Sequence, residues 1–272
     1  MKRALVSVKA LEALEKGQNT ARFLYEGDAS RVFACGGERG PVVCKRLPTF
    51  GSRADFDEYA DCFSRYLQLV RERGIRVHES QLYPVTLPDE SIAAWCVQPE
   101  LAPECLAPRL LRDAAREPGM ALFESVLALI GACCDGGVGL DAALSNWALT
   151  RGDLVYIDVT KPLLRDAQGA DLLRPELIVG GLSWPRSTLL RMGALRGWLD
   201  PFFSVRGAVL DMLGRLEEER LERWLPLFLD TANLMVDPPI SQAETRAAKL
   251  SAVRLREQLA PLRARMPSTT PV

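Results

Sequence analysis

Short segments rich in apolar residues and bounded by turn residues recur five times in the first hundred residues, a pattern that is typical of β-strands. The segments cover residues 22–25, 31–35, 42–47, 81–87 and 91–97. Turns that contain glycine separate the first three segments, and a charged turn at residues 88–90 separates the last two. Because such turns connect neighbouring strands, the pattern predicts a small antiparallel sheet.

Two helices are expected around these strands. Ser52 followed by Asp55 is typical of a capping box in which Asp stands in for the usual Glu. Apolar side chains then recur every three or four residues to about Arg73, so they line one face of a helix. A shorter amphipathic helix is expected over residues 4–16, with its end at Gly17.

Helical spacing dominates after a segment with two prolines at residues 98–103, which indicates a hinge. The expected helices cover residues 106–115, 118–134, 184–199, 205–236 and 242–265. A loop over residues 140–149 and a small hairpin that ends near residue 159 interrupt them.

The chain is therefore predicted to have five parts. They are an N-terminal accessory helix (1–19), an N-lobe with a five-stranded sheet and one helix (20–98), a hinge (99–103), a helical C-lobe (104–240), and a C-terminal helix with a disordered tail (241–272). A chain of 272 residues is long enough for one large core or two modest ones.

Composition is typical of a folded globular protein. Hydrophobic residues make up 48% and charged residues 25%, unlike the composition of disordered or fibrous chains. The formal net charge is −1, so no strong attraction to nucleic acid or to an anionic membrane is expected. No segment reaches the roughly 18–20 uncharged apolar residues that a membrane span needs.

The cysteines and the N-terminus predict a cytoplasmic protein. Seven cysteines occur without the CxxC spacing that zinc or thiol-redox sites use, and we interpret them as reduced core residues. Charged residues between Lys9 and Lys16 interrupt the first apolar run before a signal-peptide core is complete.

Several polar positions suit phosphoryl-transfer chemistry. Lys45 lies at the end of the third strand, and Asp141 and Asn146 lie five residues apart in a loop. Asp158 directly follows the apolar residues 154–157, where an acid has to be paired, bound to a metal or placed at a strand-end site. Phosphoryl transfer depends on positioning and charge neutralisation, for which a lysine and oxygen ligands of Mg²⁺ are suited. Each position alone also has a structural explanation, so the inference depends on their combination and order.

The order of three strands, a helix, two strands, a hinge and a helical half with a hairpin resembles the protein-kinase-like superfamily. The resemblance covers about residues 20–235 and is strongest to its aminoglycoside and choline kinase-type branch of small-molecule kinases. It implies a bilobal α+β fold, with a small antiparallel-sheet N-lobe and a mainly helical C-lobe. It also implies ATP or GTP, together with Mg²⁺, as cofactors.

The resemblance implies a role for each matched residue. Asp141 would be the catalytic residue that orients the acceptor hydroxyl or accepts its proton, whereas Asn146 and Asp158 would bind the metal. Lys45 would bind the nucleotide phosphates, and Glu58 would hold Lys45 in place. Three more acids lie on the same helix: Asp55, Asp57 and Asp61. The rotation of that helix decides which acid faces the lysine.

Further nucleotide contacts are expected from the first hairpin turn and from the hinge. The expected residues are Gly27, Asp28, Ala29, Ser30, Gln98, Glu100 and Leu101. Backbone amides of the turn would cover the phosphates. The acceptor would be bound by the variable helical half, roughly residues 162–201.

Three departures from the family pattern bear on activity. Gly139 stands two residues before Asp141, where the family usually has His. Val159 and Thr160 follow Asp158, where protein kinases have Phe and Gly, and the first hairpin turn contains one glycine instead of several. No clear activation segment follows, which argues against a regulated protein kinase.

Structural roles are favoured for three other features. His78 is interpreted as a surface residue, and Trp147 as part of the core. The charged run at residues 215–223 is interpreted as a solvated helix face, because an apolar stripe runs beside it.

The sequence leaves three hypotheses open. The first is a phosphotransferase that moves the γ-phosphoryl group of ATP, or of GTP, to a hydroxyl of a small molecule or biosynthetic peptide. The second is a pseudokinase that senses nucleotide or serves as a scaffold for a protein partner, and Gly139 and the glycine-poor turn motivate it. The third is an unrelated α+β protein in which the motif is accidental. Neither nucleic acid nor a membrane is expected as a partner.

Overall fold

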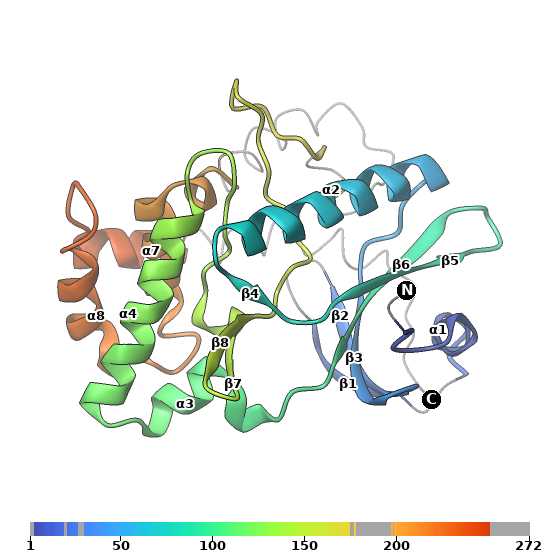
Figure 1. The fold of residues 1–272 in the computed structure, drawn as a ribbon, viewed down its shortest axis with the longest axis horizontal. Coiled ribbons are helices and arrows are strands. Elements are labelled where there is room, and N and C mark those ends of the chain that lie inside the picture. The colour runs from blue at the N-terminus through green and yellow to red at the C-terminus, as the bar shows by residue number, and fades with distance from the viewer. Residues whose placement is uncertain are drawn as a thin grey trace.

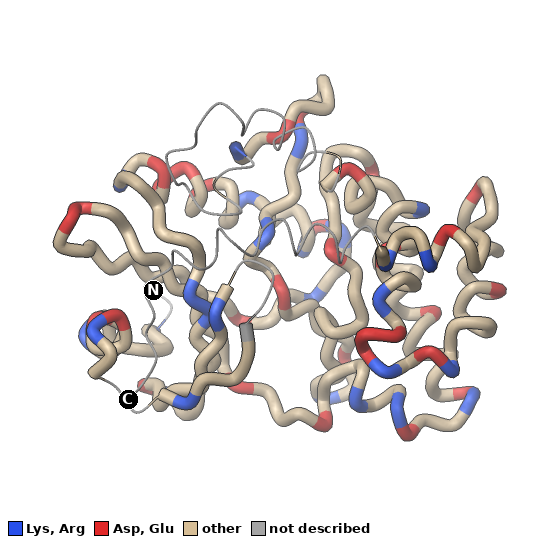
Figure 2. The backbone as a smooth tube through the Cα atoms, turned by 180° about the vertical axis from the view of Figure 1, so that it is seen from behind, with Lys and Arg blue, Asp and Glu red and all other residues tan. Residues whose placement is uncertain are grey.

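The computed structural model describes residues 3–18, 21–26, 30–174, 177, 197 and 199–250. An antiparallel sheet dominates the first half of the chain, and helices form most of the described second half (Figure 1). The predicted α+β fold, with a small sheet lobe and a mainly helical lobe, is therefore confirmed. Figure 2 shows that basic and acidic positions are interspersed along both halves.

The sheet has five strands in the order β1-β2-β3-β6-β5, and all neighbours are antiparallel. The strands are β1 (Arg22–Glu26), β2 (Arg31–Gly37), β3 (Gly40–Arg46), β5 (Gln81–Thr86) and β6 (Ile92–Pro99). They coincide closely with the five predicted segments. Lys45 of β3 lies opposite Val32 of β2 and Cys96 of β6, so it occupies the central strand and is not a charge at the sheet edge.

Helix α2 (Arg53–Glu72) lies alongside the sheet and reaches toward the second half (Figure 1). The predicted capping box is present, because the Ser52 hydroxyl accepts a hydrogen bond from the Asp55 amide at 3.1 Å and donates one to the Asp55 carboxylate at 2.9 Å. The buried face of α2 is rich in aromatic residues, and Tyr59 donates a hydrogen bond to the Thr160 carbonyl at 2.8 Å. This contact fixes α2 against the segment that follows the hairpin.

A second sheet, which was not predicted, joins the two halves of the chain. Strand β4 (Arg76–Val77) pairs in parallel with β8 (Asp153–Tyr156), and β8 forms the predicted hairpin with β7 (Trp147–Thr150). Next to β4, the His78 amide donates a hydrogen bond to the carbonyl of Tyr156 at 2.9 Å. Backbone hydrogen bonds therefore hold the chain after α2 against the strand that leads into the candidate site.

Up to Ala232, the structure describes four helices of the second half in full, and the long helix predicted over residues 205–236 is divided into two of them. They are α3 (Ala107–Asp113), α4 (Arg116–Cys133), α7 (Val205–Arg215) and α8 (Leu225–Ala232), with 3-10 turns at Pro103–Cys105, Leu144–Asn146, Asp200–Phe203 and Glu222–Trp224. The single helix predicted over residues 205–236 is wrong, because the chain turns after Arg215 and Arg220 has a left-handed φ of 59°. The helix predicted over residues 184–199 lies almost entirely outside the described residues, whereas residues 242–250 are helical.

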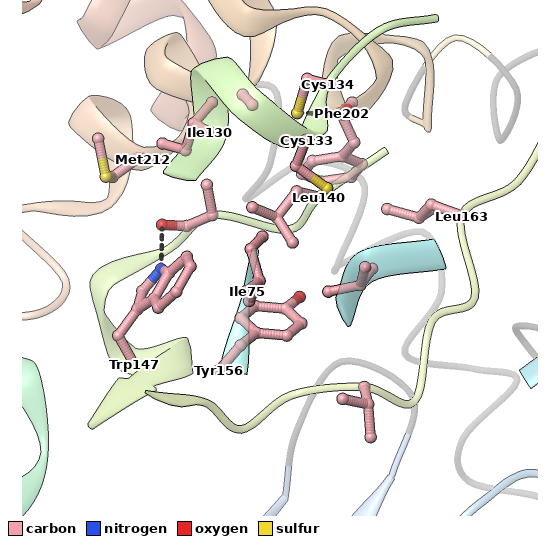
Figure 3. Packing of buried hydrophobic residues seen from close by; sticks show 14 of the residues in the cluster. Ile75, Ile130, Cys133, Cys134, Leu140, Trp147, Tyr156, Leu163, Phe202 and Met212 are labelled. Carbon is pink, nitrogen blue, oxygen red and sulfur yellow. Dashed lines mark hydrogen bonds between the residues drawn. The ribbon is translucent and has the colours of Figure 1, made fainter. Parts of the chain in front are cut away.

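Apolar residues from distant parts of the chain meet beneath the loop between α4 and β7 (Figure 3). Ile130 comes from α4, Leu140 from the loop and Tyr156 from β8. The Trp147 indole donates a hydrogen bond to the Ala142 carbonyl at 3.3 Å, so this residue lies in the core and also fixes the loop. The packing gives the polar residues of the loop a rigid base.

The accessory helix and the cysteines complete the fold. Helix α1 (Val8–Glu15) begins after its cap, Ser7, and is shorter than the helix predicted over residues 4–16. All seven cysteines are free thiols, and five of them are buried. In the part of the chain that the structure describes, no helix combines the length and the apolar character that crossing a bilayer requires.

Candidate active site

Lys45 and Asp158 meet between the five-stranded sheet and the β7–β8 hairpin. Asp158 lies two residues after the end of β8. The Lys45 Nζ atom lies 3.3 Å from Asp158 Oδ1 and 3.4 Å from the Ile157 carbonyl oxygen. Asp158 also accepts a hydrogen bond from Thr160 Oγ1 at 2.9 Å. The acid at the strand end is thus paired with a cation, as an acid in this position requires.

The predicted pair of Lys45 and Glu58 is wrong in this structure. Tyr59 occupies the buried face of α2, and Glu58 lies one residue earlier, about 100° around the helix axis. The Glu58 carboxylate instead accepts hydrogen bonds from the Arg174 guanidinium, with N–O distances between 2.8 and 3.1 Å. Asp55 binds the same guanidinium. The rotation of α2 therefore directs these acids to the partly exposed side of the helix.

Asp141 is deeply buried, with 2% of its surface exposed. Its Oδ2 atom accepts a hydrogen bond from Lys161 Nζ at 2.6 Å. Its Oδ1 atom lies 3.8 Å from Arg215 Nη2 and has no hydrogen-bond partner among the described residues. The two oxygens of this carboxylate therefore differ in their surroundings.

Asn146 is held by the backbone of its own loop. The Asn146 Nδ2 atom donates a hydrogen bond to the Asp141 carbonyl oxygen at 2.9 Å, and the Tyr156 hydroxyl donates one to the same oxygen at 3.1 Å. Because the amide nitrogen makes this bond, the carboxamide oxygen is the end of Asn146 that suits a cation.

One cavity of about 80 Å³ is lined by Lys45, Asp141, Asn146 and Asp158. Ser30, which was expected to cover the phosphates, also lines it. Pockets for drug-sized ligands have volumes of roughly 300–1,000 Å³. In this conformation the cavity therefore has room for a phosphate-sized group and not for a whole nucleotide.

The expected hinge contacts lie apart from this cavity. Gln98 is buried, and its amide donates hydrogen bonds to Ser80 Oγ at 2.9 Å and to the Ile157 carbonyl at 2.8 Å. The Glu100 amide donates to the Pro41 carbonyl at 3.0 Å. The residues expected to bind nucleotide that do not line the cavity are Gln98, Glu100 and Leu101. The expected residues Gly27, Asp28 and Ala29 lie outside the described chain.

His78 is more than a surface residue. Its Nε2 atom lies 2.8 Å from the Pro99 carbonyl oxygen, at the end of β6. The imidazole is half-buried between β4 and the hinge, so His78 is a partly exposed residue whose ring is fixed by this contact.

Ion pairing keeps the site groups charged. Burial works to raise the pKa of Asp158, but the charges of Lys45 and Lys161 lower it by more, so the net shift of this pKa is downward. Burial likewise works to raise the pKa of Asp141, whereas Lys161 and Arg215 lower it below its ordinary value. Burial works to lower the pKa of Lys45, and Asp158 more than offsets this, so that pKa is raised. Both carboxylates and the Lys45 ammonium are therefore ionised at neutral pH.

Two cations of the site were missed by the sequence analysis. Lys161 lies three residues after Asp158, and its side chain is 9% exposed. Arg215 ends α7, where its Nε atom lies 2.8 Å from Asp211 Oδ2. The interpretation of residues 215–223 as a solvated face is therefore wrong at Arg215, and also at Glu219, which accepts a hydrogen bond from the Ser145 amide at 2.7 Å and whose Oε2 atom is buried. Lys161 stands just before an apolar run, which is a weak signal of burial, whereas nothing in the charged run distinguished Arg215.

Gly139 occupies a crowded position, which explains the absence of a larger residue. A Cβ atom there would lie 3.0 Å from Leu163 Cβ and 3.1 Å from the Phe202 carbonyl oxygen. The Gly139 amide donates a hydrogen bond to the Leu163 carbonyl at 3.0 Å, and its carbonyl accepts one from the Tyr66 hydroxyl at 3.2 Å. This packing leaves no room for the His that the resemblance would place here.

Asn146 and Asp158 both line the cavity, where they supply a carboxamide oxygen and a carboxylate. Mg²⁺ takes oxygen ligands and keeps waters, so it is usually held by only one or two protein carboxylates. Among the residues that the structure describes, no cluster of three or more His, Cys, Asp or Glu side chains could hold a metal. The oxygens of Asn146 and Asp158 are thus of the type that Mg²⁺ takes.

Several solved structures are similar to this chain. WaaP in complex with acyl carrier protein is 17% identical, with a TM-score of 0.40, over 95% of this chain and 99% of that chain. The PknI kinase domain of M. tuberculosis is 17% identical, with a TM-score of 0.35, over 69% of this chain and 87% of that chain. The MAP kinase LmaMPK10 from Leishmania major is 15% identical, with a TM-score of 0.35, over 93% of this chain and 81% of that chain.

No curated protein matches the sequence. The model of one protein family matches residues 14–259, a range that includes the sheet, the helical half and the candidate active site. The chain therefore belongs to the DUF6206 family, a family of unknown function.

Proposed function

We propose that the protein is a metal-dependent phosphotransferase that moves the γ-phosphoryl group of ATP, or of GTP, to a hydroxyl group. The single observation that carries this proposal is the convergence of Lys45, Asp141, Asn146 and Asp158 on one cavity. These residues come from β3, from the loop before β7 and from the segment after β8. A cation, a buried acid and two oxygen ligands in one place are the groups that phosphoryl transfer needs.

Each residue has a role that its surroundings support. Lys45 binds nucleotide phosphates, and Asp158 holds its ammonium in place. Asp141 orients the acceptor hydroxyl and accepts its proton, because its carboxylate is buried and ionised. Asn146 and Asp158 would hold Mg²⁺, which neutralises phosphate charge when it is bound.

The acceptor is a small molecule or a biosynthetic peptide, as in the aminoglycoside and choline kinase-type branch. Among the described residues, Leu177 lines the cavity and belongs to the range 162–201 that was expected to bind the acceptor. Arg174 of the same range binds Glu58 on α2. These two contacts support the proposal that the range 162–201 binds the acceptor.

A pseudokinase that binds nucleotide without turnover is the second candidate. The crowding at Gly139 favours it, because a His two residues before Asp141, which the family usually has, would meet Leu163 and the Phe202 carbonyl. Lys45 and Asp141 are also already paired with protein side chains, as expected of a site held in a closed state. Such a protein would act as a sensor or as a scaffold for a protein partner.

The experiment that tests the proposal measures binding and turnover together. Titration calorimetry with ATP and GTP, with Mg²⁺ and with EDTA, measures binding, and release of inorganic phosphate measures transfer to water. Binding that requires Mg²⁺, followed by phosphate release that is lost in Asp141→Asn, supports the phosphotransferase. Binding without release supports the second candidate, and absence of binding by the folded protein contradicts both.

A further inference from the structure

We propose that Lys161 is a further catalytic residue, which binds the transferred phosphoryl group from the side of Asp141. This inference rests on the proposed function and adds a residue that the sequence analysis did not assign. Lys161 follows Asp158 by three residues, so one short segment supplies both the acid that pairs with Lys45 and a second cation. The Lys161 side chain lines the same cavity as these residues.

The ion pair between Lys161 and Asp141 fixes both groups at the cavity wall. Lys161 Nζ lies 2.6 Å from Asp141 Oδ2, and the two side chains are only 9% and 2% exposed. Charge-assisted hydrogen bonds of this length are among the strong ones in proteins. An ammonium has three N–H donors, and the bond to Asp141 Oδ2 uses one of them.

The second oxygen of Asp141 indicates where the acceptor would lie. Asp141 Oδ1 is buried and has no hydrogen-bond partner within the described residues, although Arg215 Nη2 lies 3.8 Å away. Leaving a buried acceptor atom without a hydrogen bond costs about 1–3 kcal/mol. A ligand hydroxyl that donates to Oδ1 would remove this cost, while Lys161 keeps Oδ2.

Two lysines among the described residues line the cavity. Lys45, on β3, pairs with Asp158, and Lys161, in the segment after β8, pairs with Asp141. In phosphoryl transfer, negative charge spreads over the three equatorial oxygens of the moving group. Two cations stabilise that charge more fully than one cation alone.

In the proposed transfer step, one P–O bond forms, one breaks, and Asp141 accepts the proton. The acceptor oxygen forms a bond to the γ-phosphorus, and the bond between this phosphorus and the β–γ bridging oxygen breaks. The electron pair of the broken bond remains on the diphosphate product, and the hydroxyl proton passes to Asp141 Oδ1. Lys161 stays protonated throughout and donates hydrogen bonds to Asp141 Oδ2 and to an equatorial phosphoryl oxygen.

Arg215 is a positioning residue in this arrangement. It lies between two acids, with Nη2 3.8 Å from Asp141 Oδ1 and Nε 2.8 Å from Asp211 Oδ2. Its charge lowers the pKa of Asp141, together with Lys161. Arg215, at the end of α7, thus helps to orient the Asp141 carboxylate and does not contact the phosphoryl group.

The test compares two nucleotides that differ in the γ-phosphate. ADP and the non-hydrolysable imido analogue of ATP are titrated with Mg²⁺ into the full chain, the Lys161→Met variant and the Lys9→Met control, whose lysine is exposed on α1. We expect Lys161→Met to weaken binding of the analogue roughly 10- to 100-fold, the range for a hydrogen bond to a charged group. Binding of ADP should change by less than about twofold, because Lys161 contacts only the γ-phosphoryl group.

A purely structural role for Lys161 predicts a different result. In that case Lys161→Met would weaken binding of ADP and of the analogue equally, or would weaken neither. Either result, in a variant that melts cooperatively, would overturn the assignment of Lys161 and leave the proposed function intact. If Lys161→Met fails to fold, Lys161→Arg and the charge-compensated double variant Lys161→Met/Asp141→Asn are titrated in the same way. The double variant must then bind the analogue more weakly than wild type while it binds ADP with unchanged affinity. A wild-type protein that binds neither nucleotide overturns the inference together with the proposed function.

Discussion

Lys45 Nζ lies 3.3 Å from Asp158 Oδ1, and this ion pair joins the central strand of the sheet to the segment after the hairpin. Glu58, which was expected to hold Lys45, binds Arg174 instead. The pair links the two halves of the candidate site directly, without an acid from α2. The predictions below begin with this relationship.

The first prediction separates Lys45 from Glu58. Lys45→Met is expected to weaken binding of Mg²⁺-nucleotide at least about 10-fold, because the phosphates lose a charge-assisted contact. Glu58→Gln is expected to change it less than about twofold, because Glu58 contacts Arg174 and does not line the cavity. Titration calorimetry measures both affinities. Equal losses in the two variants would show that α2 rotates so that Glu58 reaches Lys45 when nucleotide binds.

The second prediction concerns the stability of the Lys45–Asp158 pair. Asp158→Ala should abolish the Mg²⁺ dependence of nucleotide binding and lower the free energy of unfolding by about 1–3 kcal/mol, because it leaves the buried Lys45 ammonium without its acid. Adding Lys45→Met should restore part of that loss, since the unpaired charge is removed. Urea unfolding of the two single variants and the double variant measures the coupling. Additive losses would mean that the pair contributes nothing to stability.

The third prediction concerns Asp141. Asp141→Asn is expected to lower turnover by roughly 10²–10⁴-fold, the usual effect of losing a general base, while nucleotide affinity changes little. The reason is that Asp141 pairs with Lys161, whereas Lys45, the proposed phosphate ligand, pairs with Asp158. Phosphate release under saturating Mg²⁺-ATP measures the effect, and Asp57→Asn on the exposed side of α2 is the matched control. Full activity in Asp141→Asn would assign this residue a structural role.

The fourth prediction concerns the crowded position of Gly139. Gly139→Ala places a Cβ atom 3.0 Å from Leu163 Cβ and 3.1 Å from the Phe202 carbonyl oxygen. Overpacking of this kind costs about 1–3 kcal/mol, and the loop that carries Asp141 should shift with it. Thermal or urea unfolding measures the cost. Gly36→Ala, where a Cβ meets nothing within 4 Å, is the control and should be close to neutral.

The fifth prediction uses the opposite pKa shifts of two acids near Arg215. Burial raises the pKa of Glu219, whereas the pKa of Asp141 is lowered by its cations. A raised pKa in the folded state means that the charged form of Glu219 opposes folding at neutral pH. Glu219→Gln should therefore stabilise the protein at pH 7.

The stabilisation by Glu219→Gln should shrink as the pH falls through the raised pKa of Glu219, because the wild-type residue then binds a proton and loses its charge. Asp141 has the opposite sign: its lowered pKa contributes stability that is present above pH ~4 and is lost at lower pH. Urea unfolding between pH 4 and pH 8 measures the effect of Glu219, and unfolding below pH 4 measures the effect of Asp141. The control is Glu124→Gln on the exposed face of α4, and a constant difference between Glu219→Gln and wild type across this range would contradict the prediction.

Local sequence patterns determined most of the elements. Turn residues around short apolar segments located the five strands, and the spacing of apolar residues after Ser52 located α2, because turn chemistry and helical period are properties of the local backbone. The four apolar residues before Asp158 also indicated that this acid would be paired, bound to a metal or placed at a strand-end site. Local patterns failed for the helix over residues 205–236, where one apolar stripe continues through a turn that ends the helix.

Only the tertiary structure decided which charged groups meet. The rotation of α2 placed Tyr59 inward and Glu58 outward, and that rotation follows from packing against the whole core. Lys161 and Arg215 reach Asp141 from segments 20 and 74 residues away in sequence, which no local spacing encodes. The sequence by itself therefore determined the elements and the residue types of the site, whereas long-range packing determined the ion pairs, because Coulomb energies depend on distances in space and not along the chain.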